Sequence, residues 1–499
     1  MASVGWTPLA RLAEKGVLGL MQKITVGHLQ VLTPSHVYDF PPLQDGMSPN
    51  GPFAKLRVVK DSFWIRLALM SDLGFAEAFM YGDVDCDDLV ALFKVFLLNR
   101  DALAGMQSSP ISMLFNVSQR LTSIRFLNTL SNSRSNISAH YDISNQMFQA
   151  FLSPDMTYSC AIFPTLDGDV ILEGKHYKLR ENYHNNPSSD NEHANSDTIP
   201  PDSRKSSPVS AARDELYEAQ MIKMRYLIGK LKIPEHSDKI VRVLEIGSGW
   251  GALAILLTQT YPFIEVDSIT LSSEQKSLAE ERLRAAGVEA RVRIWLMDYR
   301  SIPESWNGIF DRVISIEMVE AVGLEFLPTY WGVLERCMKP REAVGVVQSS
   351  TMPEPRYANY IQGIDFIRKW LRTLVFPGAH VPTATSLLDG LVRGGNSKIV
   401  VDNVENIGPH YARTLREWRR RFLAKFESDI IPALQREYPD VFDDTAQGRD
   451  EIEIFKRKWV YYYCYCEAGF ANRTLGGKDT KGMGAACIRR RGKELVTSE

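Results

Sequence analysis

The stretch that decides the fold of this chain is VRVLEIGSGWG, residues 241–251, an apolar run that ends in glycines at alternate positions. The run predicts a buried strand, and Gly247, Gly249 and Gly251 let the backbone turn tightly and approach a ligand closely. In open α/β sheets, ligands bind outside the carboxyl ends of the strands, which is where this turn falls. Glu245 is placed to contact the amino or ribose groups of such a ligand. Glycine-rich turns also serve close helix–strand packing, so the motif alone leaves both readings open.

Strand-like runs alternate with helical patterns on the C-terminal side of this turn. Helical spacing is clear in SSEQKSLAEERLRAAG at 272–287. Such alternation predicts crossover connections and a mostly parallel sheet covered on both faces. We expect a helical region at about 355–395 to be inserted and to cap one end of the sheet. The predicted strands of a seven-stranded sheet are 241–247, 265–271, 290–298, 310–317, 343–350, 398–408 and 483–490.

The rest of the chain divides by composition. Residues 1–130 mix apolar runs with turn residues and predict a smaller α+β domain with a core of its own, in which nothing carries obvious chemistry. Residues 180–212 have almost no large apolar side chains and many Asn, Ser, Asp and Pro, so we expect a disordered insert. The segment 214–233 has the spacing of an amphipathic helix. We assign 131–179 and 213–492 to one catalytic domain and 493–499 to a tail.

The bulk numbers exclude some classes of protein. The 499 residues are 44% hydrophobic and 24% charged with a formal net charge of −2, which does not suggest nucleic-acid binding. The six cysteines lack the paired spacing of a zinc site and indicate reduced thiols. Without a signal peptide or an apolar run of about 20 residues, we expect a cytoplasmic protein, or one peripheral on a membrane. Three basic clusters could contact an anionic membrane, although each is explained more simply as a solvated helix face or tail. They are Arg416 with 419–421, 456–458 and 489–491.

The strand and turn VLEIGSGWG resemble motif I of the class I S-adenosylmethionine-dependent methyltransferases, and the Trp-Gly ending is typical of their cyclopropane synthase branch. A dinucleotide site is the alternative, but its third glycine would fall at Ala252. Its ribose-binding acid would end the second strand, where ITLSSEQ (269–275) stands and is similar to a signature of the same branch. For Asp298, a helix N-cap is an equally good reading. The resemblance implies S-adenosylmethionine as cofactor, bound by Glu245, Gly247, Gly249, Gly251, Thr270, Leu271, Gln275, Asp298 and Tyr299.

Four further groups of motifs resemble the cyclopropane fatty-acid synthases and mycolic acid cyclopropane synthases. They are HYDISN (140–145) with MTYSCA (156–161), SIEMVEAVG (315–323), FIRKW (366–370) with FPG (376–378), and WVYYYCYCEAGF (459–470). The resemblance covers about residues 5–475 outside the insert. It implies a Rossmann-like class I methyltransferase fold with a smaller α+β, lipid-binding-like N-terminal domain. It further implies that Tyr158, Ser159 and Ile316 contact the cofactor and that Cys160, Glu320 and Tyr462 stand at the reacting centre, although Tyr158 and Cys160 read alone fit core residues better.

The predicted strand at 343–350 departs from the pattern of this family. The family places a histidine there, which with Cys, Glu and Tyr holds a bicarbonate ion thought to act as the base, whereas this chain has Gln348. Glutamine can hold an anion by hydrogen bonds but cannot carry its proton near neutral pH. Glu317 also replaces a small residue and Ala321 a histidine. We count Gln348 among the catalytic-site residues, and the binding of bicarbonate, the identity of the base and the product stay open.

The resemblance implies an enzyme that methylates a double bond of an unsaturated acyl chain, carried by a phospholipid, to give a cyclopropane or methyl-branched product. An alkene is a weak nucleophile, so the protein must align it and keep water from the carbocation that forms. Aromatic faces stabilise such a cation, and Tyr158, Tyr462, Trp250 or Trp370 could supply them. The alternatives are a small-molecule methyltransferase of specialised metabolism and a non-catalytic lipid-binding relative. The intact cofactor motifs argue against the second, whereas Gln348 and Ala321 argue mildly for it. Peripheral membrane contact is expected and a homodimer is left open.

Overall fold

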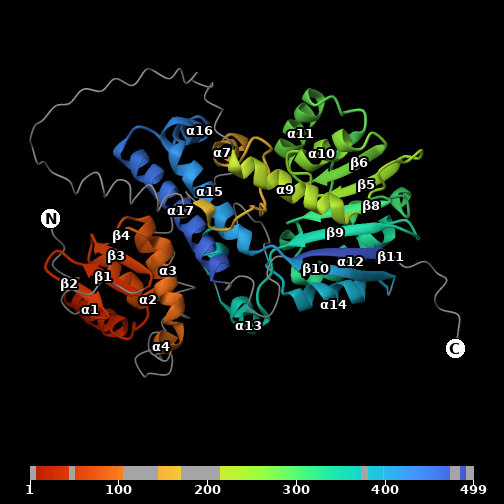
Figure 1. Cartoon of the computed structure of the whole chain (residues 1–499). Helices are drawn as coiled ribbons and strands as arrows, with labels where there is room; N and C mark the ends of the chain where they lie inside the picture. The colour runs from red at the N-terminus through yellow and green to blue at the C-terminus, as the bar shows by residue number, and fades with distance from the viewer. Residues whose placement is uncertain are drawn as a thin grey trace, which may run out of the picture.

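The computed structural model describes residues 7–43, 51–104, 144–169, 214–363, 365–371, 380–396, 398–472 and 484–490. The predicted insert at 180–212, the tail, and the motif residues 140–143 and 376–378 lie outside these ranges. Figure 1 shows an N-terminal unit and a larger sheet-containing part, with long helices between them.

The larger part is built on the seven-stranded sheet that the sequence predicts. β5 to β9 are parallel to one another, whereas β11 runs antiparallel to both β9 and β10. The apolar runs around the glycine turn therefore form the centre of the sheet, and the carboxyl ends of β5 and β8 lie side by side. In spatial order the strands are β10 (Ile399–Asn406), β11 (Gly484–Arg490), β9 (Val344–Ser349), β8 (Arg312–Ile316), β5 (Val241–Ile246), β6 (Ile264–Thr270) and β7 (Val292–Leu296).

Helices cover both faces of this sheet, as continuous apolar strands require. Leu244 and Val313 belong to a core shared with α12 (Leu327–Cys337), whereas their neighbours Val243 and Ile314 belong to a core on the opposite face. That second core is shared with α9 (Glu215–Lys230), α10 (Ala252–Thr260) and α11 (Ser273–Ala285). The predicted helical insertion contains α13 (Glu354–Gln362) and α14 (Ala384–Gly394), and α14 packs along α12. The class I methyltransferase fold is confirmed.

The N-terminal unit is a four-stranded sheet packed against helices, in agreement with the predicted α+β domain. Its strand order is β2-β1-β3-β4, with β1 (His28–Leu32) parallel to β3 (Phe53–Val58). β2 (Val37–Phe40) and β4 (Val84–Cys86) form the edges. The helices are α1 (Thr7–Met21), α2 (Ser62–Met80), α3 (Leu89–Leu98) and α4 (Arg100–Ala104).

The expectation that this unit has a core of its own is wrong. Its buried residues belong to one cluster with those of α7 (Asn145–Phe151), α15 (Pro409–Ala424) and α17 (Ala446–Ala471). Tyr461 of α17 brings its ring within 6.3 Å of Phe75, 6.0 Å of Phe79 and 5.3 Å of Phe93. The reason is that the aromatic run of α17 is apolar all round and must be covered on several sides.

Two of the basic clusters considered for membrane contact turn inward instead of forming solvated faces. On α15, Arg416 and Arg419 pair with buried Glu467 of α17, and Arg421 pairs with Asp214. On α17, Lys458 is 2% exposed. The ion pairs of Arg416, Arg419 and Arg421 therefore join α15 to other parts of the chain. Within the described ranges, we find no helix with both the length and the apolar character needed to cross a bilayer.

Candidate active site

The glycine turn between β5 and α10 adopts the backbone that its sequence predicts. Gly247, Gly249 and Gly251 have φ angles of 96°, 49° and 81°, a region that favours glycine. A Cβ atom added at Gly249 would meet no described atom within 4 Å, whereas one at Gly251 would lie 3.4 Å from Ala279 of α11. Gly249 therefore leaves open space for a ligand, and Gly251 allows close helix packing. Both roles considered for the motif occur in the same turn.

Glu245 ends β5 in a buried polar network. Its carboxylate accepts a hydrogen bond of 2.5 Å from Ser268, whose hydroxyl also lies 2.7 Å from that of Ser248. Burial raises the pKa of Glu245 to about 7, although the Ser268 hydrogen bond and the charge of Lys223 lower it. The predicted contact between Glu245 and a cofactor stays a prediction.

The other predicted cofactor residues end the neighbouring strands. After β6, the Thr270 hydroxyl lies 2.8 Å from the side-chain oxygen of Gln275, and Leu271 is 74% exposed. After β7, Asp298 caps a short 3₁₀ turn and pairs with Arg300, so the N-cap reading is confirmed. Tyr299 is buried, with its ring edge-on to Tyr330. Ile316 ends β8 and pairs with Gln348 of β9.

The segment 152–163 is held against the sheet by three helices. From α9, the Lys223 ammonium donates to the Ser159 hydroxyl at 2.8 Å and the Gln220 amide to the Ser159 carbonyl at 2.8 Å. From α15, Thr414 accepts from the Ala161 N–H at 3.1 Å. From α11, Arg282 donates to the Pro154 carbonyl at 3.3 Å. The position of Tyr158, Ser159 and Cys160 is therefore set by residues far away in the sequence.

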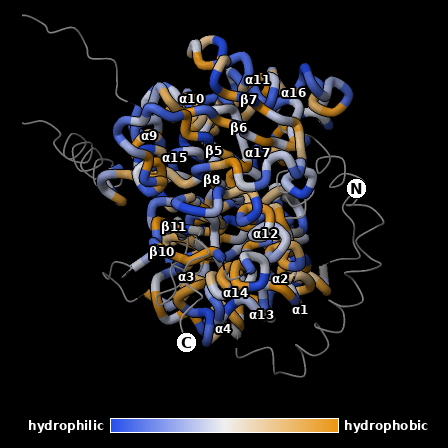
Figure 2. The backbone as a smooth tube through the Cα atoms, turned by 90° about the vertical axis from the view of Figure 1, so that its right-hand side faces the viewer, coloured by the Kyte–Doolittle hydropathy of each residue, from blue (hydrophilic) through white to orange (hydrophobic). Residues whose placement is uncertain are grey.

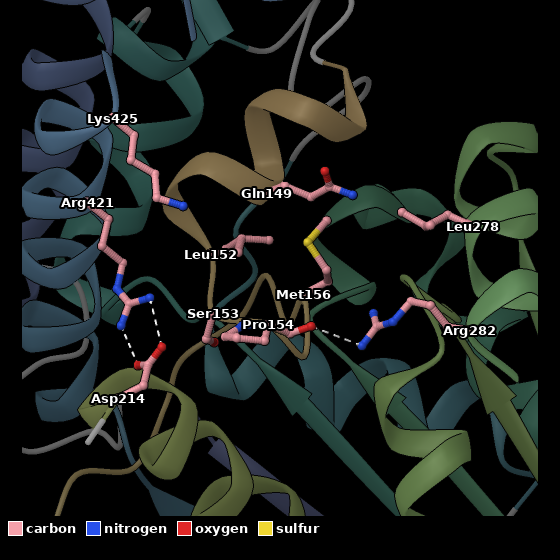
Figure 3. A pocket seen from close by; sticks show the side chains of 10 residues that line it. All are labelled: Gln149, Leu152, Ser153, Pro154, Met156, Asp214, Leu278, Arg282, Arg421 and Lys425. Atoms are coloured by element: carbon pink, nitrogen blue, oxygen red, sulfur yellow. Dashed lines mark hydrogen bonds and ion pairs between the residues drawn. The ribbon is translucent and has the colours of Figure 1, made fainter. Parts of the chain in front are cut away.

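A cavity of about 430 Å³ adjoins the start of this segment. In Figure 3, Arg282 reaches the Pro154 carbonyl on one side, while Arg421 pairs with Asp214 on the other. The cavity includes neither the glycine turn nor the carboxylates described below, so we do not identify it with the reacting centre. Its lining residues are Gln149, Leu152, Ser153, Pro154, Met156, Asp214, Leu278, Arg282, Arg421 and Lys425.

Tyr158 and Tyr462 meet, as the resemblance implies. Their hydroxyl oxygens lie 3.1 Å apart, and the Tyr158 ring stacks on Trp418 at 4.9 Å. Burial raises the pKa of both tyrosines, so both are neutral phenols near pH 7. Cys160 is fully buried, and its thiol points to the carbonyls of Ala161 and Ile407. Burial also raises the pKa of this thiol, so Cys160 contributes its backbone and not a thiolate.

A carboxylate that we did not count among the site residues lies at the centre of this arrangement. Glu317 directly follows β8, and its Oε1 accepts hydrogen bonds from the Cys160 N–H at 2.8 Å and the Gln348 amide at 2.7 Å. Its Oε2 accepts from the hydroxyl of Tyr411, on α15, at 2.9 Å. Burial raises the pKa of Glu317, whereas these hydrogen bonds and the charge of Lys223 lower it.

Glu320, the predicted catalytic glutamate, lies one 3₁₀ turn further, at Val319–Ala321. Its Oε1 accepts from the Ser350 N–H, and its Oε2 has no hydrogen-bond partner among the described residues. Burial and then the charge of Glu317 raise the pKa of Glu320 to about 8. Glu320 is therefore mostly a neutral carboxylic acid at pH 7.

The site thus unites most of the predicted catalytic residues and adds four that we missed. Gln348, Cys160 and Glu317 form one hydrogen-bonded group, with Tyr158 and Tyr462 paired nearby. A signal existed for Lys223 and Gln220, because both lie on the apolar face of α9. Glu317 was visible as an acid in place of a small residue. The missed residues are Gln220, Lys223, Glu317 and Tyr411.

Comparisons with known proteins show the family of this chain. The model of the family described as mycolic acid cyclopropane synthetase matches residues 128–185 and 209–476. Tuberculostearic acid methyltransferase UfaA1 of Mycobacterium tuberculosis is 31% identical over 406 residues, which are 81% of this chain and 77% of that protein. Cyclopropane-fatty-acyl-phospholipid synthase of Escherichia coli is 26% identical over 438 residues, covering 86% and 88%.

Among solved structures, two cyclopropane synthases match at low overall similarity. MmaA2 from Mycobacterium tuberculosis has a TM-score of 0.47 at 20% identity, covering 71% of this chain and 97% of that one. Mycolic acid cyclopropane synthase CmaA1, complexed with SAH and CTAB, has a TM-score of 0.48 at 22% identity, covering 71% and 98%.

Proposed function

Because the chain belongs to the mycolic acid cyclopropane synthetase family, we propose that it methylates a carbon–carbon double bond in an unsaturated acyl chain carried by a phospholipid. The product is a cyclopropane or a methyl-branched chain. The observation that carries this proposal is the pair of carboxyl groups, Glu317 and Glu320, beside the phenols of Tyr158, Tyr411 and Tyr462. This reaction needs a proton acceptor in dry, aromatic surroundings.

The chain is an S-adenosylmethionine-dependent methyltransferase. When bound, this cofactor supplies an electrophilic methyl group. The residues present fit it, because the turn is open at Gly249 and Thr270, the last residue of β6, is hydrogen-bonded to Gln275 of α11. We propose that it is held by Gly247, Gly249, Thr270, Leu271 and Gln275 with the other residues predicted from the sequence.

The protein's own contribution is positioning and the exclusion of water. Tyr158 is stacked on Trp418, and Tyr462 packs edge-on against Trp459 at 5.6 Å. These rings form a wall that can stabilise a developing cation and offers it no strong nucleophile. Trp250 ties α7 to the glycine turn through a 2.7 Å hydrogen bond to Asn145, while Trp370 packs against Phe366 in the core, so neither needs to face the substrate.

The lipid substrate is supported by the names of the relatives. At 31% and 26% identity, these are a tuberculostearic acid methyltransferase and a cyclopropane-fatty-acyl-phospholipid synthase. The test is mass spectrometry of phospholipids from a host that makes unsaturated lipids, with and without this protein. We expect a gain of one methylene unit in unsaturated chains, and proton NMR then separates a cyclopropane from a methylene-branched product. Turnover on a soluble amine instead, or cofactor binding without turnover on any unsaturated phospholipid, would contradict the proposal.

We further propose that the enzyme reaches its substrate by peripheral contact with a membrane. Helix α1 exposes Leu9 and Leu12, at 52% and 70%, and lies with α2, α4 and α13 at one end of the molecule (Figures 1 and 2). Since the arginines of α15 are paired, apolar side chains carry this contact. Replacing Leu9 and Leu12 by serine should reduce co-flotation with phospholipid vesicles, whereas Ile240→Ser is the control, because Ile240 is 56% exposed and directly precedes β5 of the large sheet. Equal flotation of both variants would contradict it.

A further inference from the structure

We propose that Glu317 is the general base of the reaction, so that the chain itself provides the carboxylate that removes the proton and needs no dissociable anion. This inference rests on the proposed function, because it assigns the proton acceptor of that reaction. It differs from the sequence-based expectation that Glu320 fills this role.

The first argument is the set of groups that hold Glu317. Its two carboxylate oxygens accept three hydrogen bonds, from a backbone N–H, an amide and a phenol, at 2.7 to 2.9 Å. These donors come from the segment 152–163, β9 and α15, which meet only in the folded chain. Such a set of donors stabilises a carboxylate and orients it. Glu317 is only half-buried, so part of its surface stays exposed.

The second argument is the division of charge between the two carboxyl groups. Two carboxyls that share a buried site do not both ionise readily. Glu317 has donors from three other elements and the fully buried ammonium of Lys223 nearby. Glu320 is hydrogen-bonded by Ser350 and its own N–H, its Oε2 has no hydrogen-bond partner among the described residues, and burial together with the charge of Glu317 raises its pKa to about 8. The negative charge therefore resides on Glu317 and the proton on Glu320. At neutral pH, Glu317 is the group able to accept a proton.

The third argument is the backbone. Glu317 has a φ of +50°, in the left-handed region that favours glycine, at the end of a central strand. A residue with a side chain costs about 1 kcal/mol or more there. Backbone strain of this kind is retained where the surrounding structure and the chemistry require a particular side chain. At position 317, the side chain that the chemistry requires is the carboxylate.

The step balances as follows. The alkene electron pair forms a bond to the methyl carbon while the carbon–sulfur bond breaks, which leaves a neutral thioether and a carbocation on the acyl chain. The Glu317 carboxylate then removes a proton, and the C–H electron pair closes the cyclopropane ring or forms a new double bond. Loss of the proton from the added methyl group gives the ring. Glu317 becomes a carboxylic acid and later releases the proton to solvent.

The test uses the full chain and three variants, Glu317→Gly, Glu317→Gln and Glu320→Gln. Glycine suits the φ of this position, so Glu317→Gly should fold and leave a cavity with three unpaired donors. We expect turnover of Glu317→Gly and Glu317→Gln to fall by about 100-fold or more, with cofactor affinity by calorimetry unchanged. Glu320→Gln should keep at least about tenfold more turnover than Glu317→Gln, because it replaces a neutral acid.

Chemical rescue by a small carboxylate distinguishes a residue that acts as the base from one that only supports the structure. Sodium formate or bicarbonate should restore turnover of Glu317→Gly but not of Glu317→Gln, and bicarbonate depletion should leave the wild type unaffected. A wild type that requires bicarbonate, or a Glu317→Gln variant as active as the wild type, would overturn the proposal.

A binding experiment keeps this test independent of the proposed substrate. Carbon-13 formate should bind Glu317→Gly and not the wild type in NMR titrations, because the wild-type carboxylate already occupies the donors. If the wild type methylates no unsaturated lipid but this binding difference appears, the proposed function fails while the placement of the carboxylate stands. Absence of formate binding to Glu317→Gly would overturn that placement.

Discussion

Replacing Lys223 by methionine should change the ionisation of the site more than the stability of the fold. Lys223 is fully buried, and its ammonium donates to the Ser159 hydroxyl at 2.8 Å. Loss of a hydrogen bond from a charged group costs about 1.5–3 kcal/mol. Methionine also removes the penalty of burying an ammonium, which is several kcal/mol and has the opposite sign. The net change in the free energy of unfolding should therefore be within about 2 kcal/mol, measurable in urea.

The effect on Glu317 has a definite sign. The Lys223 ammonium lowers the pKa of the Glu317 carboxyl, so its removal should raise that pKa. Because the base must be ionised, turnover should then be lost at a higher pH as the solution is acidified. The assay is kcat/KM for an unsaturated phospholipid as a function of pH, in which the acidic limb should move to higher pH.

Lys458 provides a matched control. It is also a buried lysine, with a pKa lowered by burial to about 8, but its charge partner is Glu451 on its own helix. Lys458→Met should alter stability without moving the acidic limb. If Lys223→Met leaves the limb in place while Glu317→Gln abolishes turnover, the reasoning about the charge of this pocket is wrong.

Three further predictions concern other parts of the chain. Gly249→Val should abolish binding of S-adenosylmethionine in calorimetry, because the side chain would occupy the open space at the turn. Gly287→Val is the control and should bind the cofactor normally, because Gly287 has a φ of +66° and equally open surroundings. Equal affinities of the two variants would refute the cofactor site. Replacing residues 182–211 by a short Gly-Ser linker should preserve turnover, since loop closure depends only weakly on length, and an inactive but folded variant would show that the insert takes part in function. Because the pKa of Glu320 is raised from 4.5 to about 8, it contributes stability that is present below pH 4.5 and lost as the pH rises through 8. In urea unfolding, Glu320→Gln should flatten this decline, and an unchanged pH dependence would contradict the neutral state of Glu320.

The strands and the cofactor turn were predictable because they depend on local pattern. The central strands β5, β6, β8 and β9 are largely buried runs of five to seven residues, and the alternation with helices implies a parallel sheet. The glycines at 247, 249 and 251 indicate a turn with positive φ wherever the chain leads afterwards. The N-cap role of Asp298 was also visible, because a cap involves only the next two or three residues.

The reacting centre was only partly predictable. The resemblance predicts that Tyr158, Cys160 and Tyr462 lie in one site, and the structure places the hydroxyl oxygens of the two tyrosines 3.1 Å apart. The resemblance also indicates Glu320, and not Glu317, as the catalytic glutamate. Which of two neighbouring acids is ionised depends on donors from other elements, and no sequence pattern records those.

The sequence by itself determined the fold, the cofactor turn and the family of this protein, because strand patterns, glycine turns and spaced motifs are properties of short segments. Tertiary structure alone decided that the N-terminal unit shares its core with α17, and that Arg416 and Arg421 of α15 pair with acids of other elements instead of facing solvent. It also decided that Lys223, Tyr411 and the Cys160 N–H converge on Glu317. The physical reason is that burial and electrostatic interaction act through space, between residues that are tens to hundreds of positions apart in the chain.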